Sequence, residues 1–386
     1  MARRKTTQAV LVDPDELITS VDAKVNSVRT QSIDFSFNEL ADMYQADELI
    51  IDPEFQRMFR WPEGSQARFI ESLLLELPVP PIFLIEREDR VYELIDGLQR
   101  ISSYLHFRGQ LKVAGELQDP LVLADCDIVK ELNGLTYADL PRALEIKLKR
   151  SYIRAEILRK ESDRRLRYYM FKRLNTGGEI LEAQEVRNAT IRLLSNEFNS
   201  FLSALSKDEN FAYCVDTISD NQKLQKFDQE LVLRFFSYKN DGNRYRHDVA
   251  NFLTDYMEAV SDPTSDTAFD YDAERSIFER TFRALRMISA HLGINSKIFG
   301  TVDPRYPEPK SQFSVYHYEG LVLGLQPVLD RIDLENAGQI DRLGTAVMKG
   351  KFDREFLKHC GGGKNSRNEL NARINYFAKA FKAAVS

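Results

Sequence analysis

Two short apolar runs, Ile82–Glu86 and Val91–Ile95, are separated by only a few polar residues, and they constrain the fold more than any other feature. Runs of this length around a tight polar turn predict a β-hairpin. The second run continues directly into Asp96-Gly97-Leu98-Gln99-Arg100, and apolar residues then recur at helical spacing to Phe107. The chain must therefore turn from a strand into a helix at a glycine, and such a corner presents free N–H groups and a partial positive charge.

Further elements are expected on both sides of this corner. Ser36, with Glu39 three residues later, is typical of a capped helix start. The pattern also predicts a short strand at 48–51, a helix at 63–77 that prolines end, a strand at 152–158 and a charged helix at 162–173. From about residue 181 onward the periodicity is helical, with stretches at 183–205, 228–238, 273–292, 313–332 and 368–384. We therefore predict an α+β part with a small mixed sheet, followed by an all-α part.

Composition excludes several classes of protein. The 386 residues are 43% hydrophobic and 29% charged, which is typical of a globular chain of two or three domains and not of a disordered one. The three cysteines form no CxxC or Cys/His cluster, so neither a disulfide framework nor a zinc site is expected. The apolar stretch 73–85 contains three prolines and is too short to cross a bilayer, and the basic first residues precede no apolar core of a signal peptide. We expect a cytoplasmic protein with reduced thiols and no membrane partner.

Charge is uneven along the chain. The net charge is −6, yet residues 142–173 contain twelve basic and four acidic residues. Such a stretch is either a solvated surface balanced by acids elsewhere or a surface that meets the phosphates of a nucleotide or of DNA. The sequence leaves both interpretations open.

The segment Asp96–Arg100 holds the best candidates for chemistry. Asp96 can hold Mg²⁺ or orient a water molecule, and Gly97 leaves no Cβ to block a ligand. Gln99 can place a water molecule or contact a polar ligand, and Arg100 can donate two hydrogen bonds to phosphate oxygens. The plainer alternative is an Asp N-cap followed by a charged first turn.

Two more segments are candidates for the same site. Gln56 and Arg57 lie on a polar turn shortly before Trp61, the single tryptophan, where an arginine can face a ligand or form an ordinary surface ion pair. The loop Asn175-Thr176-Gly177-Gly178 can direct backbone N–H groups at an anion, although a glycine C-cap of a helix is the more ordinary interpretation of the loop by itself. Glu185, Arg187 and Asn188 follow on the next predicted helix.

In their order along the chain, these segments resemble one family. The resemblance is carried by Phe55-Gln56-Arg57 with Trp61, Ile70–Leu74 with Pro78–Ile82, Ile95–Arg100, Phe171–Gly178 and Gln184–Asn188. They are similar to the N-terminal domain of GmrSD-type restriction systems, which is related to the ParB/sulfiredoxin fold. The resemblance covers about residues 35–195.

The resemblance implies a nucleotide-binding and nucleotide-hydrolysing domain in defence against foreign DNA. It implies a ParB-like domain at residues 31–180, between a flexible segment at 1–30 and an α-helical domain at 181–386. The catalytic residues implied are Asp96, Gln99 and Arg100, with Mg²⁺ on Asp96. The nucleotide-binding residues implied are Gln56, Arg57, Gly97, Arg100, Asn175, Thr176, Gly177 and Gly178.

Two departures from the family pattern bear on function. The family motif is Asp-Gly-Gln-Gln-Arg, and here Leu98 replaces one Gln. Hydrolysis is slowed if that Gln takes part in it, whereas nothing is lost if position 98 faces the core. Many relatives carry a C-terminal HNH-type nuclease domain, but none of the five histidines here has metal-ligand spacing. We expect an NTPase with a separate nuclease partner, and the alternatives are a Mg²⁺-dependent nuclease in the same cleft and a DNA-binding adaptor without catalysis.

Overall fold

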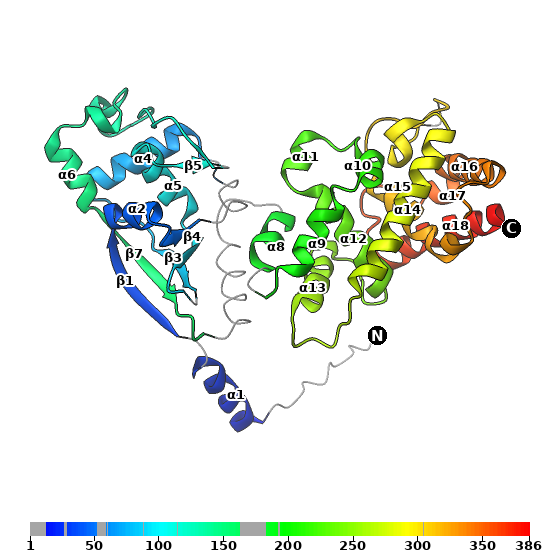
Figure 1. Ribbon diagram of the computed structural model, residues 1–386, viewed down its shortest axis with the longest axis horizontal. Helices are drawn as coiled ribbons and strands as arrows, with labels where there is room; N and C mark the ends of the chain where they lie inside the picture. The colour runs from blue at the N-terminus through cyan, green and yellow to red at the C-terminus, as the bar shows by residue number, and fades with distance from the viewer. Residues whose placement is uncertain are drawn as a thin grey trace, which may run out of the picture. The chain divides into compact units, whose positions relative to one another are not determined.

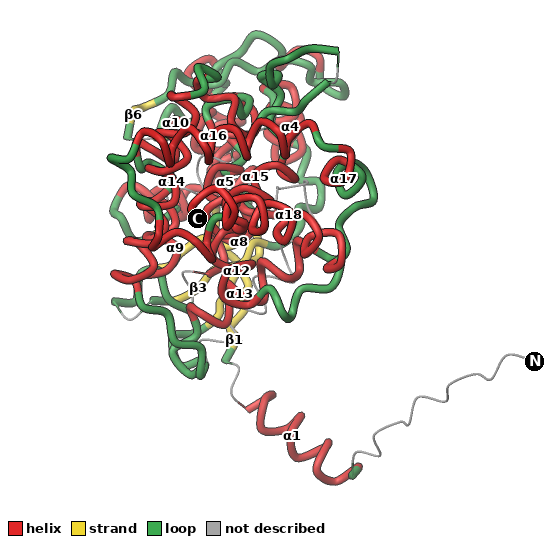
Figure 2. Tube along the Cα trace, turned by 90° about the vertical axis from the view of Figure 1, so that its right-hand side faces the viewer, coloured by secondary structure: helices red, strands yellow, loops and turns green. Residues whose placement is uncertain are grey.

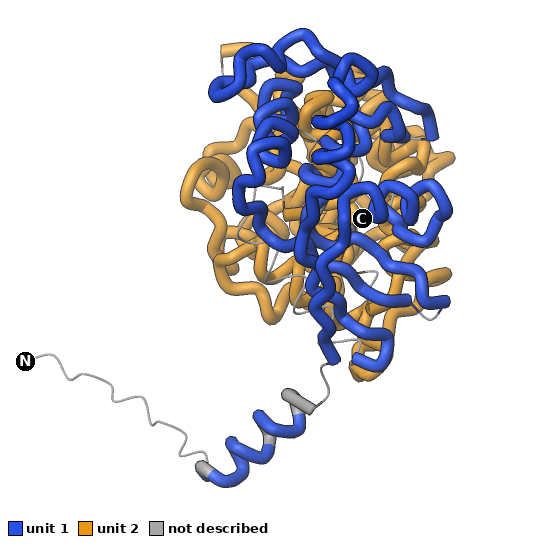
Figure 3. The backbone as a smooth tube through the Cα atoms, turned by 90° about the vertical axis from the view of Figure 1, so that its left-hand side faces the viewer, with its two compact units in different colours: residues 1–178 blue, residues 179–386 orange. Residues whose placement is uncertain are grey.

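The computed structural model describes residues 13–26, 29–51, 59, 61–87, 89–113, 115–162, 183–191, 194–303 and 305–386. The chain divides into two compact units, residues 1–178 (unit 1) and residues 179–386 (unit 2), which Figure 3 draws in two colours. All named strands of the described residues lie in unit 1, while unit 2 is helical apart from one isolated bridge between Gly300 and Phe313. The strands and helices are distinguished by colour in Figure 2. The predicted fold class, a mixed α+β part followed by a helical part, is confirmed.

Unit 1 is built on a five-stranded sheet in the order β1-β7-β3-β4-β2. The strands are β1 (Thr30–Ser36), β2 (Leu49–Ile50), β3 (Ile82–Glu86), β4 (Tyr92–Asp96) and β7 (Tyr152–Leu158). The pairs β1–β7 and β3–β4 are antiparallel, whereas β7–β3 and β4–β2 are parallel. Two further strands, β5 (Lys112–Val113) and β6 (Glu116–Leu117), form a separate hairpin. The predicted hairpin is therefore the β3–β4 pair, and β3 occupies the centre of the sheet.

Unit 1 also contains several helices. They are α1 (Pro14–Asn26), α2 (Phe37–Gln45), α4 (Glu63–Leu74), α5 (Leu98–Phe107) and α6 (Arg142–Arg150), with 3₁₀ turns η1 (Lys130–Leu132) and η2 (Tyr137–Asp139). Of these helices, α2, α4 and α5 lie against the sheet and α1 extends away from it (Figure 1). The predicted cap of α2 is present, since the Ser36 hydroxyl accepts a hydrogen bond from the N–H of Glu39 at 3.1 Å. The predicted charged helix at 162–173 lies outside the described residues from position 163 onward.

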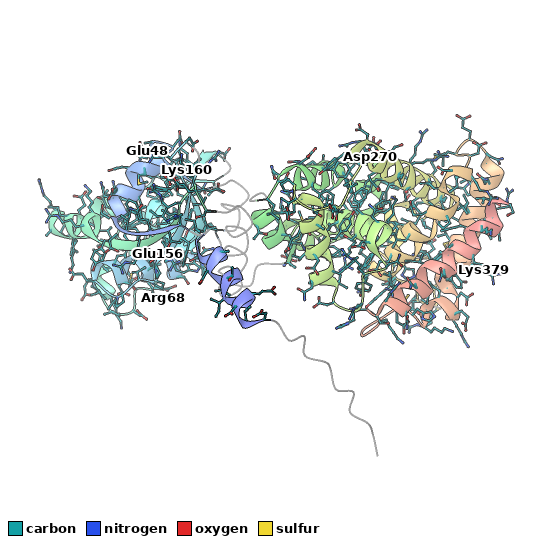
Figure 4. All side chains as sticks on the ribbon, turned by 90° about the horizontal axis from the view of Figure 1, so that it is seen from below. Glu48, Arg68, Glu156, Lys160, Asp270 and Lys379 are labelled. Carbon is teal, nitrogen blue, oxygen red and sulfur yellow. The ribbon has the colours of Figure 1, made fainter. Side chains whose placement is uncertain are left out.

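Unit 2 contains the other helices of the described residues. They are α8 (Ala183–Ile191), α9 (Glu197–Leu205), α10 (Glu209–Val215), α11 (Asp220–Leu224), α12 (Phe227–Asp241), α13 (Val249–Ser261), α14 (Tyr271–His291), η3 (Asn295–Phe299), α15 (Val315–Gly324), η4 (Gln326–Arg331), α16 (Ala337–Phe352), α17 (Arg354–Leu357) and α18 (Arg367–Val385). Asp270, which is labelled in Figure 4, caps α14 by accepting a hydrogen bond from the N–H of Ala273. Among the described residues, no helix is both long enough and apolar enough to cross a membrane.

Two of the long predicted helices are divided in the structure. The helix expected at 183–205 is α8 followed by α9, because Ser195 and Asn196 favour a new helix start and the Ser195 hydroxyl accepts from the N–H of Glu197. The helix expected at 313–332 ends at Gly324 and continues as η4, because Pro327 has no N–H to donate to an α-helical hydrogen bond. Periodicity alone did not show either interruption.

Helix α15 is the buried centre of unit 2. Two small residues on α15, Gly320 and Gly324, allow α18 to approach closely. A Cβ atom added at Gly324 would lie 2.6 Å from the Cβ of Phe377. Side chains at these two positions would therefore force α15 and α18 apart.

A buried ionic network connects three helices around Glu319. The Glu319 carboxylate accepts from Arg234 of α12 at 3.1 Å and from Arg373 of α18 at 2.6 Å. The side chains of Glu319 and Arg373 are 4% and 2% exposed. Charges this deeply buried are tolerated only when they are paired, so the network ties α12, α15 and α18 together.

Replacing Glu319 by Gln should destabilise unit 2 strongly. The substitution leaves the buried guanidinium group of Arg373 without a carboxylate, at a cost of about 3–5 kcal/mol, while Arg234 keeps its pair with Glu230. The matched control is Glu355→Gln, which removes an exposed pair with Lys358 and should cost less than about 1 kcal/mol. Urea unfolding followed by circular dichroism measures both changes, and equal midpoints for the two variants would contradict the role of Glu319.

Candidate functional site

The turn from β4 into α5 is set by the backbone of Gly97. Asp96 is the last residue of β4, Gly97 has φ +104°, and α5 begins at Leu98. A Cβ atom at position 97 would lie 2.3 Å from the Cγ2 of Ile82 on β3. Only glycine satisfies both the left-handed conformation and this close approach.

Asp96 and Arg100 meet at this corner. The Nη2 of Arg100 donates to the Oδ2 of Asp96 at 2.7 Å, and its Nη1 donates to the backbone oxygen of Pro80 at 3.0 Å. The side chain of Arg100 is only 14% exposed, whereas that of Asp96 is 38% exposed. The guanidinium group is therefore held in place by protein contacts, and the carboxylate beside it remains open to solvent.

Gln99 has a role that the sequence did not predict. Its Oε1 accepts a hydrogen bond from the backbone N–H of Trp61 at 3.0 Å, and the Trp61 carbonyl accepts from Gln66 Nε2 of α4 at 2.7 Å. Both backbone polar groups of Trp61 are thus bound to side chains of two helices. Gln99 anchors the segment that directly follows Gln56 and Arg57 in the sequence.

His106 extends this network along α5. Its Nδ1 lies 2.8 Å from Oε1 of Gln66, and its Nε2 lies 2.9 Å from the backbone oxygen of Asp119. Phe59 packs edge-on against the imidazole, with 6.5 Å between ring centroids. Burial lowers the pKa of His106 below its usual value. These contacts are those of a packed structural histidine.

Leu98 points away from the open corner. Its side chain is 5% exposed and belongs to the buried face of α5 together with Ile101 and Leu105. Of the two alternatives drawn from the sequence, the structure favours the one in which position 98 faces the core.

Other predicted site residues are not brought to this corner by the described structure. Gln56, Arg57 and the loop 175–178 lie outside the described residues. Within unit 2, Arg187 pairs with Glu230 of α12 at 3.2 Å, and Asn188 donates to Gln229 at 2.6 Å. Both α8 side chains are buried, so they join α8 to α12. The predicted nucleotide-binding roles of Gln56, Arg57 and residues 175–178 stay predictions.

Comparison with known proteins identifies the N-terminal part of the chain. Residues 37–192 match the family model described as "GmrSD restriction endonuclease, N-terminal domain". We call this matching segment the GmrSD domain. The match confirms the resemblance that the five ordered motifs indicated. No curated protein and no solved structure matches the chain.

The side chains at the corner of the GmrSD domain could hold Mg²⁺ only if the phosphates of a bound substrate supplied further oxygen ligands. Among the described residues, no group of three or more His, Cys, Asp or Glu side chains could hold a metal ion. Asp96 is the one carboxylate of the motif, and it is partly open to solvent. Mg²⁺ is often bound by one or two carboxylates together with substrate phosphates and water. Asp96 fits that arrangement, and it does not fit an all-protein metal cage.

Much of the basic stretch in the GmrSD domain is neutralised locally. Four of its basic side chains pair with acids: Lys147 with Glu76, Lys149 with Glu145, Arg154 with Asp34 and Arg159 with Glu86. Arg154 forms a two-bond contact across β1 and β7, which is a sheet-stabilising pair. For residues 142–162, the solvated and acid-balanced surface is therefore the better of the two interpretations.

Replacing Gly97 by Ala should destabilise unit 1 beyond the cost of backbone strain alone. A left-handed conformation costs a non-glycine residue about 1–3 kcal/mol, and contact with Ile82 adds to this cost. The control is Gly115→Ala, because Gly115 also has positive φ (+86°) but a Cβ atom added there would have no neighbour within 4 Å. Chemical denaturation should show the larger loss for Gly97→Ala. Equal losses would show that the approach to Ile82 does not constrain the corner.

Replacing Gln99 by Leu should change the environment of Trp61. The substitution leaves the Trp61 N–H without its acceptor, at a cost of about 1–3 kcal/mol. Because Trp61 is the single tryptophan, its emission reports the change directly. We expect an altered emission maximum or faster acrylamide quenching relative to Gln118→Leu, which removes a bond within the β5–β6 hairpin. Identical emission in both variants would contradict the anchoring role of Gln99.

Proposed function

We propose that the GmrSD domain binds a nucleoside triphosphate at the Asp96–Arg100 corner and hydrolyses it as part of a bacterial DNA restriction system. The family match at residues 37–192 supports the restriction context. The chemistry rests on the corner itself. A separate nuclease subunit is the proposed partner that cuts DNA.

One observation carries the proposal: a guanidinium group and a solvent-accessible carboxylate meet at the start of α5, 2.7 Å apart. A guanidinium has five N–H donors, and Arg100 uses two of them in its bonds to Asp96 and Pro80. The proposal assigns the remaining donors to phosphate oxygens. The first turn of α5 adds backbone N–H groups and a partial positive charge on the same side.

Asp96 would hold Mg²⁺ together with the phosphates of the nucleotide. The ion would neutralise negative charge on the phosphate groups when it is bound. Arg100 would bind the same phosphates, and its existing contact with the Pro80 carbonyl would fix its orientation. Prior orientation matters because phosphoryl transfer depends mainly on positioning and charge stabilisation.

Gln99 would position the Arg57 segment and would not contact the nucleotide. Its side-chain oxygen is already bonded to the N–H of Trp61, and only three residues separate Trp61 from Arg57. Arg57 and the loop 175–178 remain the proposed further contacts to the phosphates. Leu98 faces the core, so its replacement of the family Gln does not alter the open corner.

The decisive substitution is Asp96→Asn. Its effect is measured as the rate at which the full chain releases phosphate from ATP and GTP in the presence of Mg²⁺. We expect turnover to fall about 100-fold or more, the scale of losing one charge-stabilising group from such a site. The control is Asp89→Asn, an exposed residue of the β3–β4 turn, which should leave turnover unchanged. Omission of Mg²⁺ should abolish turnover by the unmodified protein.

Equilibrium binding tests the proposed nucleotide binding separately from the proposed hydrolysis. Arg100→Ala should weaken the binding of a slowly hydrolysed ATP analogue, measured by isothermal titration. Unchanged turnover in Asp96→Asn would remove the carboxylate from the mechanism. Unchanged binding in Arg100→Ala would remove the corner as the phosphate site.

A further inference from the structure

A second concentration of positive charge lies in unit 2, around an open hollow of about 620 Å³. Two segments line the hollow: residues 243–246, which follow α12, and residues 366–368, at the start of α18. Together they contribute three arginines, Arg244, Arg246 and Arg367. No motif singled out in the sequence included these residues.

The two segments are joined by hydrogen bonds. The backbone N–H of Arg367 donates to the carbonyl of Arg246 at 2.7 Å, and the hydroxyl of Tyr245 donates to the carbonyl of Asn365. Tyr245 is 2% exposed, so it attaches its segment to the core of unit 2. The backbone that carries the three arginines is therefore held in place by hydrogen bonds and by the buried Tyr245.

The guanidinium groups of the hollow are poorly neutralised by protein. Among the described residues, the Arg246 side chain has no hydrogen-bond or ion-pair partner. Arg367 donates to the neutral amide oxygen of Asn243 at 3.1 Å, and Arg244 has one acid, Asp241, at 3.4 Å. The buried arginines of the same unit, by contrast, make close contacts with carboxylates.

Acids near the hollow have other partners. Asp248 accepts hydrogen bonds from Asn251 and caps α13. Glu369 binds His359 and Lys364. The start of α18 is itself capped by the Ser366 hydroxyl, so the excess charge comes from the arginines and not from an open helix end.

We propose that this hollow binds the phosphate backbone of a nucleic acid. Guanidinium groups bind phosphate oxygens with two parallel hydrogen bonds, and arginine is the preferred residue for that contact. Three arginines around a wide, open hollow match closely spaced phosphates along a strand better than they match one small anion. Contacts of this kind fix a nucleic acid without reading its sequence.

The test is fluorescence anisotropy of the full chain with a labelled 30-base-pair DNA duplex over a range of salt concentrations. Arg246→Ala should weaken binding about 5–10-fold near 0.1 M salt, and it should reduce the slope of log affinity against log salt by about 0.9. The double variant Arg244→Ala/Arg246→Ala should reduce the slope about twice as much. Duplexes of unrelated sequence should show equal losses.

The matched control is Arg283→Ala, which removes an exposed arginine of α14 outside the hollow. It should leave the affinity and the salt slope close to those of the unmodified protein. Affinities and slopes in the hollow variants equal to those of the control would overturn the proposal. A loss confined to ATP binding, with DNA binding unchanged, would also overturn the assignment to a nucleic acid backbone. Nucleotide hydrolysis, measured in parallel, should be the same in all variants because the corner of unit 1 is intact.

Discussion

The left-handed backbone at Gly97 is the constraint on which the candidate site depends. This backbone conformation ends β4 and starts α5 within one residue. Because Gly97 has no Cβ, the side chain of Ile82 on β3 can pack directly against it. Asp96 and Arg100 are then four residues apart across the turn and form an ion pair. An open carboxylate beside a fixed guanidinium group is thus a direct result of one backbone conformation.

The second constraint is the hydrogen-bond chain from Gln99 through Trp61 and Gln66 to His106. It joins α4 and α5 to the end of the segment that contains Arg57. Within the described residues, Asp96 and Arg100 present polar atoms to the corner, whereas the Gln99 side chain binds the backbone of Trp61.

Much of unit 1 was predictable because its signals are local. The β3–β4 hairpin, the Ser36 cap and the glycine corner follow from residues that are close in the sequence. β1 was missed, because only one of its seven residues, Phe35, is buried, and its pairing with β7 joins residues more than a hundred positions apart.

The site was predictable only in part, for similar reasons. The residue types at 96, 97 and 100 indicate a strand-to-helix corner by themselves, and the structure places them there. The bond from Gln99 to a backbone N–H 38 positions away leaves no trace in the sequence pattern. The arginine hollow of unit 2 likewise depends on two segments 120 positions apart, which only the fold brings together.

The most direct test of the central claim is a crystal structure of the full chain with Mg²⁺ and a non-hydrolysable nucleoside triphosphate. The account predicts phosphate oxygens within hydrogen-bond distance of the Arg100 guanidinium, and the metal ion on the carboxylate of Asp96. A nucleotide whose phosphates lie elsewhere, with the Asp96–Arg100 pair still facing solvent, would contradict it.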